Sequence, residues 1–302
     1  MSAPDSTVLP AALPYVSVIV PTFNGADTLP ALLAALAAQT YPRERMQVLV
    51  ADDASTDGTA ALLAQHAPQV QHVRLDRNRG SYAARNAALA QARGDIIAFT
   101  DADCQPHPDW LLQGVRALQQ QGGGLVAGAV AIEPVARASV VQRYDQAFGI
   151  QQAFFALRKR FGATANLLVD RRVLATVPAF DENLRSGGDK AFCDVCTAQG
   201  QAFSYAPQSR VAHPPRLALG ELVIKQARIA RGHAQIFARW SRYRILPLSC
   251  HPVESFDNAA FQREGSAWFR WRFRALYYGL ELVYLLHYAR ACLKLTLKER
   301  LS

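Results

Sequence analysis

The sequence predicts an α/β fold built on a mostly parallel sheet, and three observations support this prediction. Short apolar runs that suit buried strands alternate with segments of helical periodicity. The connections between them are short, so right-handed crossovers are the economical way to join the strands. Half of the 302 residues are hydrophobic, which is enough for a sizeable core.

Four strands and three helices are expected in the first third of the chain. The strands cover residues 16–20, 47–51, 70–74 and 96–99, and the helices end near residues 38, 66 and 92. Four leucines of the first helix form one apolar stripe, with Asp27 or Thr28 as the cap. Turn-forming residues at 55–58 and 78–81 separate strands from helices.

The pattern is less regular after Trp110. The expected elements are a helix ending near residue 121, a strand at 125–132, a helical stretch at 137–160, a strand at 163–169, a loop at 180–188 and helices starting at Asp189 and near residue 267. We predict an N-terminal extension at 1–14, one domain at 15–215 and a basic, aromatic-rich helical region at 216–302.

Two carboxylates follow the strand predicted at 96–99. In open α/β sheets ligands bind at the carboxyl ends of strands, so Asp101 and Asp103 stand where a ligand would lie. An extended chain has a side-chain period of two, which should point both carboxylates to one side. Such ligands suit Mg²⁺ or Mn²⁺, which also takes phosphate oxygens and water. The structural alternative is a strand end that caps the next helix.

Other site types are less well supported. The turn after the first strand has one glycine, Gly25, where a dinucleotide fold needs G-x-G-x-x-G, and no G-x-x-x-x-G-K-[ST] occurs. Cys193 and Cys196 lack a second pair for a zinc site, so helix packing explains them better. Five cysteines and an N-terminus without a basic segment predict no signal peptide, and reduced thiols in a cytoplasm.

Four stretches, in order, make the chain resemble glycosyltransferase family 2. They are VSVIVPTFNG (16–25), VLVADDASTDGT (48–59), RGSYAARNAALAQARGDIIAFTDADCQPHPDWL (79–111) and LRSGGDKAFC (184–193). The resemblance spans about residues 15–215. It implies an inverting enzyme of GT-A fold, in which a Rossmann-like nucleotide-binding sheet is fused to an acceptor-binding half, here with a C-terminal helical extension.

The resemblance also implies a donor nucleotide site with a metal ion. The donor-binding residues that it indicates are Pro21, Thr22, Phe23, Asp53, Arg85 and Asp101. An aromatic ring offers a stacking face, and a carboxylate can accept a hydrogen bond from a base N–H. Asp103 matches the residue that coordinates the Mg²⁺ or Mn²⁺ on the diphosphate, and Asp101 lies near ribose and metal. The ion offsets charge on the leaving nucleoside diphosphate.

Asp189 is the candidate general base, because members of the family use the Asp of an E-D pair to deprotonate the acceptor hydroxyl. Here the pair is Gly188-Asp189, and Ala191 stands where another acid often occurs, so this part departs from the family pattern. A helix that begins at Asp189 should favour its ionised form through the helix dipole. The structural alternative is a helix N-cap.

Five residues have two interpretations each. Arg85 could contact a phosphate or base edge, or lie on the surface of its helix, and Asp52 could simply cap the next helix. His213 matches a strand-end histidine of related enzymes and could meet the metal, or it could cap the proline-rich loop that follows. Arg228 and Arg231 could clamp phosphate or face water or lipid. They replace the Q-x-x-R-W of processive synthases, so polymer synthesis is not expected.

Positive charge is concentrated at the C-terminus. The chain has 17 Lys and Arg against 18 Asp and Glu through Ser209, and 16 against 6 from Arg210 onward. In the helix expected at 267–297, one apolar face consists of Trp268, Trp271, Ala275, Tyr278, Leu282, Leu285, Ala289, Leu293 and Leu297. Charged residues, including Arg274 and Glu281, interrupt it too often for a membrane span.

The helix at 267–297 therefore has two possible roles. Tryptophans beside Arg270, Arg272 and Arg274 suit a helix lying at the lipid headgroups, and the alternative is a helix docked on the catalytic domain. No nucleic-acid-binding motif accompanies the basic charge, so no nucleic acid partner is expected.

The resemblance, together with these residues, predicts a metal-dependent inverting glycosyltransferase in the cytoplasm, with peripheral binding to the inner face of the membrane as one option. It would move one sugar from a nucleotide diphosphate sugar to an acceptor hydroxyl on a saccharide or lipid-linked glycan of the envelope. One alternative is a polyprenyl-phosphate sugar transferase, whose phosphate acceptor needs no strong base. The other is a non-catalytic protein that binds sugar nucleotides as a scaffold.

Overall fold

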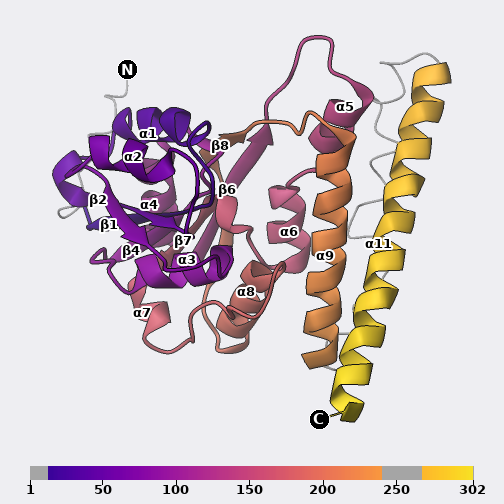
Figure 1. Cartoon of the computed structure of the whole chain (residues 1–302). Helices are drawn as coiled ribbons and strands as arrows, with labels where there is room; N and C mark the ends of the chain where they lie inside the picture. Colours follow the sequence, from indigo (N-terminus) through magenta and orange to yellow (C-terminus); the bar gives the residue numbers. More distant parts are fainter. Residues whose placement is uncertain (1–12, 240–266, 302) are drawn as a thin grey trace, which may run out of the picture.

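The computed structural model describes residues 13–239 and 267–301, and a mixed sheet forms its centre (Figure 1). The strand order within the described residues is β3-β2-β1-β4-β7-β6-β8-β5. The strands are β1 Val16–Thr22, β2 Met46–Asp52, β3 Gln71–Arg74, β4 Ile96–Phe99, β5 Gln105–Pro106, β6 Leu125–Ile132, β7 Leu167–Asp170 and β8 Phe203–His213. The predicted α/β class is confirmed.

Helices cover both faces of this sheet. Those of the sheet domain are α1 Leu29–Ala37, α2 Thr59–Gln65, α3 Ser81–Leu89, α4 Trp110–Gln120, α5 Val140–Phe148, α6 Gln152–Lys159, α7 Arg171–Leu174 and α8 Gly188–Ala198, with short 3-10 helices at Arg43–Arg45 and Thr164–Asn166. Thr28 occupies the N-cap position of α1, but its side chain makes no capping hydrogen bond.

The first half of the sheet is parallel, as predicted. β1 pairs in parallel with β2 and β4, and β2 with β3. Ile96 and Ala98 of β4 pack into the apolar cluster on one face, whereas Ile97 and Phe99 pack into the cluster on the other. Because both faces are covered, the strand is an uninterrupted apolar run, and its carboxyl end leads directly to Asp101.

The strand predicted at 163–169 begins later and runs in the opposite direction to its neighbours. Residues Thr164–Asn166 form a 3-10 turn, and β7 pairs antiparallel with β4 and β6. Asn166 explains the turn, because its buried amide donates to the carbonyl oxygens of Ala129 (2.8 Å) and Ser209 (2.9 Å). This side chain bridges β6 and β8 where their register shifts.

The helical stretch predicted at 137–160 is two helices, α5 and α6, separated at Gly149. A side chain at Gly149 would bring its Cβ to 2.4 Å from the carbonyl oxygen of Asp145. The turn therefore needs glycine. Ser139 and Gln142 form a capping box at the start of α5.

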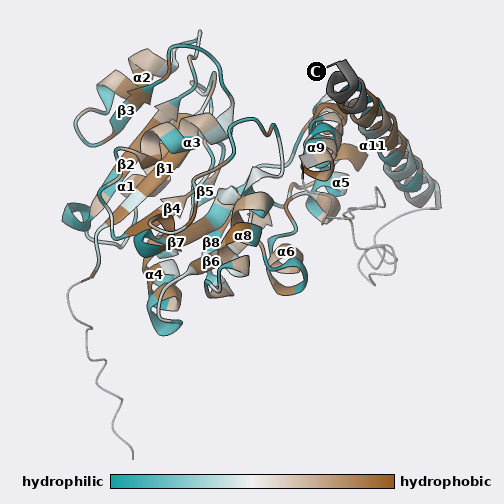
Figure 2. Cartoon of the chain, turned by 90° about the horizontal axis from the view of Figure 1, so that it is seen from below, coloured by the Kyte–Doolittle hydropathy of each residue, from teal (hydrophilic) through white to brown (hydrophobic). Residues whose placement is uncertain are grey.

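Two long helices lie beside the sheet domain. These are α9 Leu219–Arg239 and α11 Ala267–Leu301, and α11 packs on the side of α9 that faces away from the sheet (Figures 1 and 2). No helix within the described residues is long and apolar enough to cross a membrane. The predicted boundary at residue 215 falls between β8 and α9, and the division into domains stays a prediction.

The predicted apolar face of α11 is not the face that packs on the protein. Phe273, Tyr277 and Leu280 of α11 are buried against Tyr144, Phe148 and Leu222 of α5 and α9. All eight members of the predicted face whose side chains are described, from Trp268 to Leu293, are exposed, and Leu297 lies outside the described side chains. The helix is therefore docked through one apolar face while a second apolar face remains on the surface.

Candidate active site

The acidic pair lies on a tight turn after β4. The Cys104 N–H donates to the carbonyl oxygen of Asp101 at 3.1 Å, so the backbone turns there and the extended geometry predicted for this stretch is wrong. The carboxylates nevertheless converge, because ligand atoms of Asp101, Asp103 and Cys104 lie within 4.8 Å of one another. Burial raises the pKa of the Cys104 thiol well above its usual value, so this sulfur is a poor ligand for a hard cation.

His213 completes the acidic pair from the end of β8. Its ring is buried, with Nε2 3.3 Å from Oδ2 of Asp103 and Nδ1 2.7 Å from the carbonyl oxygen of Pro214. The carbonyl accepts the Nδ1–H, so Nε2 is the ring nitrogen that faces the carboxylate. A cation between them would satisfy both groups. Both interpretations of His213 therefore hold: Nδ1 contacts the loop that follows β8, and Nε2 contacts the acidic pair.

Asp101, Asp103 and His213 fit a divalent cation such as Mg²⁺ or Mn²⁺ in charge and ligand type. The Asp103 side chain keeps 41% of its surface exposed, yet its surroundings still raise its pKa by desolvation. A positive ion would oppose that effect.

Arg85 is buried under the acidic pair, so the surface interpretation of this residue is wrong. Its side chain is 5% exposed, and Nη2 donates to Oδ1 of Asp101 at 2.5 Å. The guanidinium also lies over the ring of Tyr82, 5.7 Å from its centroid. Among the described residues its Nε has no hydrogen-bond partner. Arg85 therefore holds one oxygen of Asp101 in place, and its Nε–H is still available to donate a hydrogen bond to a ligand.

The predicted base-binding residues lie on the loops that follow β1 and β2. Pro21 and Thr22 are buried at the end of β1, whereas the ring of Phe23 is 50% exposed and available for stacking. The backbone N–H of Asp53 donates to the carbonyl oxygen of Thr22 at 2.8 Å, which holds the two loops together. The Thr22 hydroxyl is buried with no hydrogen-bond partner in the described part of the chain.

Asp53 has a structural role that the sequence did not indicate. Its two carboxylate oxygens accept the backbone N–H groups of Arg79 and Gly80, each at 2.7 Å. Gly80 has a φ of +97°, a conformation that favours glycine. Asp53 thus shapes the loop that leads into α3, and its predicted contact with a nucleotide base stays a prediction.

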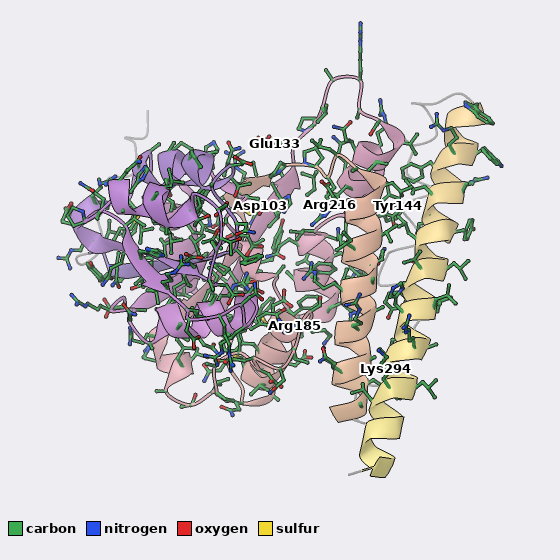
Figure 3. All side chains as sticks on the ribbon, viewed as in Figure 1. Asp103, Glu133, Tyr144, Arg185, Arg216 and Lys294 are labelled. Carbon is green, nitrogen blue, oxygen red and sulfur yellow. The ribbon has the colours of Figure 1, made fainter. Side chains whose placement is uncertain are left out.

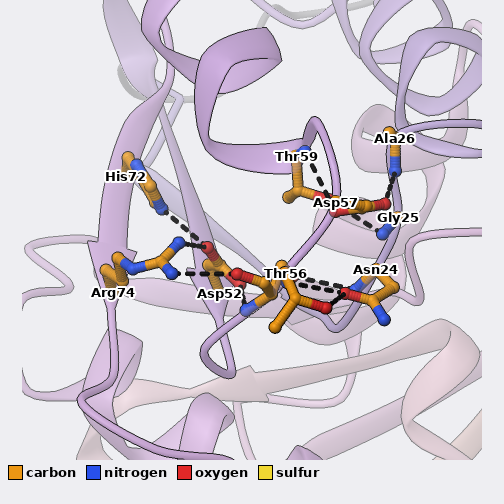
Figure 4. A network of polar contacts seen from close by, with 10 residues as sticks. Asn24, Gly25, Ala26, Asp52, Thr56, Asp57, Thr59, His72 and Arg74 are labelled. Carbon is orange, nitrogen blue, oxygen red and sulfur yellow. Dashed lines mark hydrogen bonds and ion pairs between the residues drawn. The ribbon is translucent and has the colours of Figure 1, made fainter.

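Asp52 is a buried structural carboxylate and not a helix cap. It accepts hydrogen bonds from Arg74 (2.5 Å) and from the N–H of Ser55 (2.8 Å), and His72 lies 3.4 Å away (Figure 4). The same figure shows the loop after β1 tied to the loop after β2, where the Thr56 N–H donates to Oδ1 of Asn24 at 2.9 Å.

Asp189 lies in the first turn of α8, after Gly187, which is the N-cap. The N-cap interpretation of Asp189 is therefore wrong. The residue retains some exposure, but its carboxylate is surrounded by protein, and desolvation raises its pKa against the opposing effect of Arg85. The predicted dipole effect is thus outweighed by burial. The Tyr82 hydroxyl accepts the Gly188 N–H at 2.8 Å and fixes the start of α8.

The geometry thus brings the predicted site residues into one region at the carboxyl edge of the sheet. Arg85 contacts Asp101 and influences the pKa of Asp189, so the acidic pair and the candidate base are neighbours. A cation site, an exposed aromatic ring and a separate buried carboxylate could together bind a charged nucleotide and accept a proton.

Comparison with known proteins identifies the family that this sequence resembles. Residues 17–177 match the sequence profile of glycosyl transferase family 2. Glycosyltransferase AglE of Haloferax volcanii is 35% identical over 244 residues, which cover 79% of this chain and 80% of AglE. An undecaprenyl-phosphate 4-deoxy-4-formamido-L-arabinose transferase of Pseudomonas savastanoi is 34% identical over 122 residues, or 39% of this chain and 36% of that protein.

A solved structure has a similar fold. Mannosyltransferase PcManGT of Pyrobaculum calidifontis, in complex with GDP-Man and Mn²⁺, superposes with a TM-score of 0.63 over 93% of this chain and 87% of its own, at 22% identity. The predicted GT-A architecture is therefore confirmed.

Proposed function

The chain belongs to glycosyl transferase family 2, and from this we propose that it transfers a single sugar from a nucleotide diphosphate sugar to an acceptor hydroxyl, with inversion. One observation carries the proposal. Asp101, Asp103 and His213, a group suited to a divalent cation, lie near a separate carboxylate, Asp189. The guanidinium of Arg85 pairs with Asp101, and its charge opposes the rise in the pKa of Asp189.

We assign Asp101, Asp103 and His213 to the metal. Mg²⁺ or Mn²⁺ held there would offset the negative charge that develops on the departing nucleoside diphosphate. PcManGT, whose fold is similar, is solved with GDP-Man and Mn²⁺, which is compatible with a nucleotide sugar and a divalent ion here. Phe23 and Asp53 would hold the nucleotide base. Pro21 and Thr22, which precede Phe23, would support its aromatic ring.

We assign Asp189 the role of general base. The carboxylate would accept the proton of the acceptor hydroxyl as the oxygen attacks the anomeric carbon from the face opposite the leaving nucleotide, which inverts the configuration. Its burial raises its pKa, and a more basic carboxylate accepts a proton more readily.

We place the acceptor in the synthesis of an envelope or lipid-linked glycan. The Pseudomonas relative is named for an undecaprenyl-phosphate substrate, which supports a lipid-linked acceptor here. The exposed apolar face of α11 supports peripheral binding through residues 267–297 to the cytoplasmic face of the membrane.

The test is a panel of nucleotide sugars with Mn²⁺, scored for release of nucleoside diphosphate with and without EDTA. We expect one donor to be cleaved, and both EDTA and Asp103→Ala to abolish the release. Glu44→Ala is the matched control, because Glu44 is an exposed carboxylate ahead of the amino end of β2 and should leave the rate unchanged.

The other outcomes separate the alternatives. Release that survives both EDTA and Asp103→Ala would contradict the metal assignment. An active enzyme in which Asp189→Asn is harmless would favour a phosphate acceptor that needs no base. Metal-dependent nucleotide binding without turnover, even with lipid-linked acceptors, would favour the scaffold.

A further inference from the structure

One face of α9 carries two basic residues, Lys225 and Arg228. Lys225, Arg228, Gly232 and Gln235 follow one another at three- and four-residue steps, so they share a side of the helix. At one end of this face a side chain at Gly232 would bring its Cβ to 2.4 Å from the Ser186 carbonyl oxygen, so the backbones are in close contact.

The C-terminal end of this face is fixed next to the candidate base. Gln235 Nε2 donates to the carbonyl oxygen of Asn183 at 3.0 Å, and Gln235 Oε1 accepts the Arg185 N–H at 3.4 Å. These contacts hold the loop that leads into α8 and Asp189. Arg228, which lies one turn before Gly232, is close enough for its charge to oppose the rise in the pKa of Asp189.

The other end of the face is tied to Asp145 of α5. Lys225 Nζ is 3.2 Å from Oδ1 of Asp145, and Arg216 Nη1 is 3.0 Å from the same oxygen. Asp145 is fully buried. Arg216 follows β8 closely, and its charge opposes the rise in the pKa of Asp103. In the view of Figure 3, Arg216 lies between Asp103 and Tyr144 of α5.

Positive charge exceeds negative charge in this cluster. Asp145 is the carboxylate that pairs with both Arg216 and Lys225, and Arg228 has no recorded partner within the described residues. Burial, followed by the charge of Arg216, lowers the pKa of Lys225 to about 8. Arg216 uses one nitrogen of its guanidinium on Asp145, and its Nη2 and Nε have no recorded partner in the described chain. The three cations thus keep unused donors, and Asp145 is the one carboxylate that forms an ion pair with any of them among the described residues.

We propose that Arg216, Lys225 and Arg228 bind a phosphate or diphosphate group of the acceptor. Arg and Lys side chains together are the usual ligands of phosphate, and a bound anion would relieve the mutual repulsion of the three cations. The inference rests on the proposed function, since it takes Asp189 as the place where the acceptor hydroxyl reacts. An acceptor bound there extends along α9, and its anionic group then meets this face.

The alternative source of the same chemistry is the diphosphate of the donor. Two probes distinguish the sources, and both are measured by calorimetry on the full-length chain. Inorganic pyrophosphate without metal probes the anion site, and a nucleoside diphosphate with Mn²⁺ probes the donor site. Farnesyl phosphate in place of pyrophosphate then tests whether a lipid phosphate binds better than a free one.

We expect Lys225→Gln/Arg228→Gln to weaken pyrophosphate binding at least tenfold and to change nucleoside diphosphate binding less than twofold. Arg231→Gln is the matched control, because Arg231 is an exposed cation of the same helix without a recorded partner in the described chain. It should leave both affinities unchanged. The single variant Arg228→Gln changes an exposed residue and should weaken pyrophosphate binding by itself. It keeps the test valid if substitution of the largely buried Lys225 causes misfolding.

Unchanged pyrophosphate binding in the double variant would overturn the proposal. An equal loss of pyrophosphate and nucleoside diphosphate binding would also overturn it, because the cations would then belong to the donor site. Donor cleavage by the wild type is scored separately. Cleavage with no anion site on α9 would refute this inference alone, whereas an anion site without any cleavage would refute the transferase assignment.

Discussion

At the residue scale, Asp189 is the side chain whose chemistry the structure defines best. It lies in the first turn of α8, its carboxylate is enclosed by protein, and Arg85 and Arg228 carry the nearby positive charges. We expect Asp189→Asn to lower kcat by about 10²–10⁴-fold, the usual contribution of a general base, because an amide cannot accept the proton. Affinity for the nucleoside diphosphate with Mn²⁺ should stay the same, and a matching loss of that affinity would contradict the assignment.

The pH dependence of activity gives an independent test of Asp189. Because burial raises its pKa, the carboxylate becomes protonated at a higher pH than an ordinary aspartate, whose pKa is about 3.9. A protonated base is inactive, so kcat/KM should fall on the acid side at a pH above about 4. Nucleoside diphosphate binding over the same range is the control. A profile that is flat down to pH 4 would exclude a raised pKa at the catalytic base.

Tyr82 positions the first turn of α8, which carries Asp189, through a hydrogen bond to the neighbouring Gly188. Its hydroxyl accepts the buried Gly188 N–H, and a side chain at Gly188 would bring its Cβ to 2.7 Å from the ring. Tyr82→Phe leaves that N–H unpaired, which should cost about 1–3 kcal/mol in the free energy of unfolding. Denaturant unfolding measures this. A loss below about 0.5 kcal/mol would mean that another acceptor replaces the hydroxyl.

At the scale of elements, α11 has two apolar faces with different environments. Leu280 is 1% exposed in the cluster with Tyr144 and Phe148, whereas Leu282 on the opposite face is 57% exposed. Leu280→Ala should lower the free energy of unfolding by about 2–5 kcal/mol, because it removes methyl groups from a packed core. Leu282→Ala, the same substitution two residues away, should change it by less than about 0.5 kcal/mol. Equal effects would contradict the docked orientation of α11.

The same helix shows what could be predicted from the sequence and what could not. Three- and four-residue steps identify a helical face, but they do not identify what covers it, so the predicted stripe of α11 is the exposed one. Strands β4 and β6 were predicted with their observed bounds, because each is a continuous apolar run. The antiparallel β7 follows a turn at which the buried amide of Asn166 bonds to β6 and β8, and such tertiary contacts are not contained in the local sequence pattern.

The candidate site was predictable to a similar extent. Asp101, Asp103 and His213 converge as their positions at strand ends suggested, although the acidic pair does so through a turn. The ion pair of Arg216 with Asp145 joins residues 71 positions apart, and no spacing rule relates them. Such pairs depend on how α9 packs against the sheet domain, so the basic face of α9 required the structure.

At the scale of the whole molecule, the charge of the C-terminal third and the exposed face of α11 act together. Trp268 and Trp271 are 63% and 60% exposed, and their rings stack 5.1 Å apart. Basic residues flank this face, and the exposed ones whose side chains are described are Arg272, Arg274, Arg290 and Lys294. Each basic residue near an anionic membrane contributes about 1 kcal/mol, and aromatic and aliphatic side chains add burial in the interface.

We therefore expect the protein to bind vesicles that contain phosphatidylglycerol and to leave vesicles of phosphatidylcholine alone, with an affinity that falls as salt is added. Leu282→Glu/Leu285→Glu places two carboxylates on the exposed face of α11 and should weaken this binding at least tenfold, because burial of two leucines is lost and like charges repel. Leu157→Glu is the matched control, since Leu157 is an exposed leucine of another helix, α6. Co-sedimentation measures the binding, and analytical ultracentrifugation without vesicles reports self-association. Vesicle binding that the double variant retains would place the membrane contact elsewhere, and a concentration-dependent dimer that the variant abolishes would assign the face to a second copy of this chain.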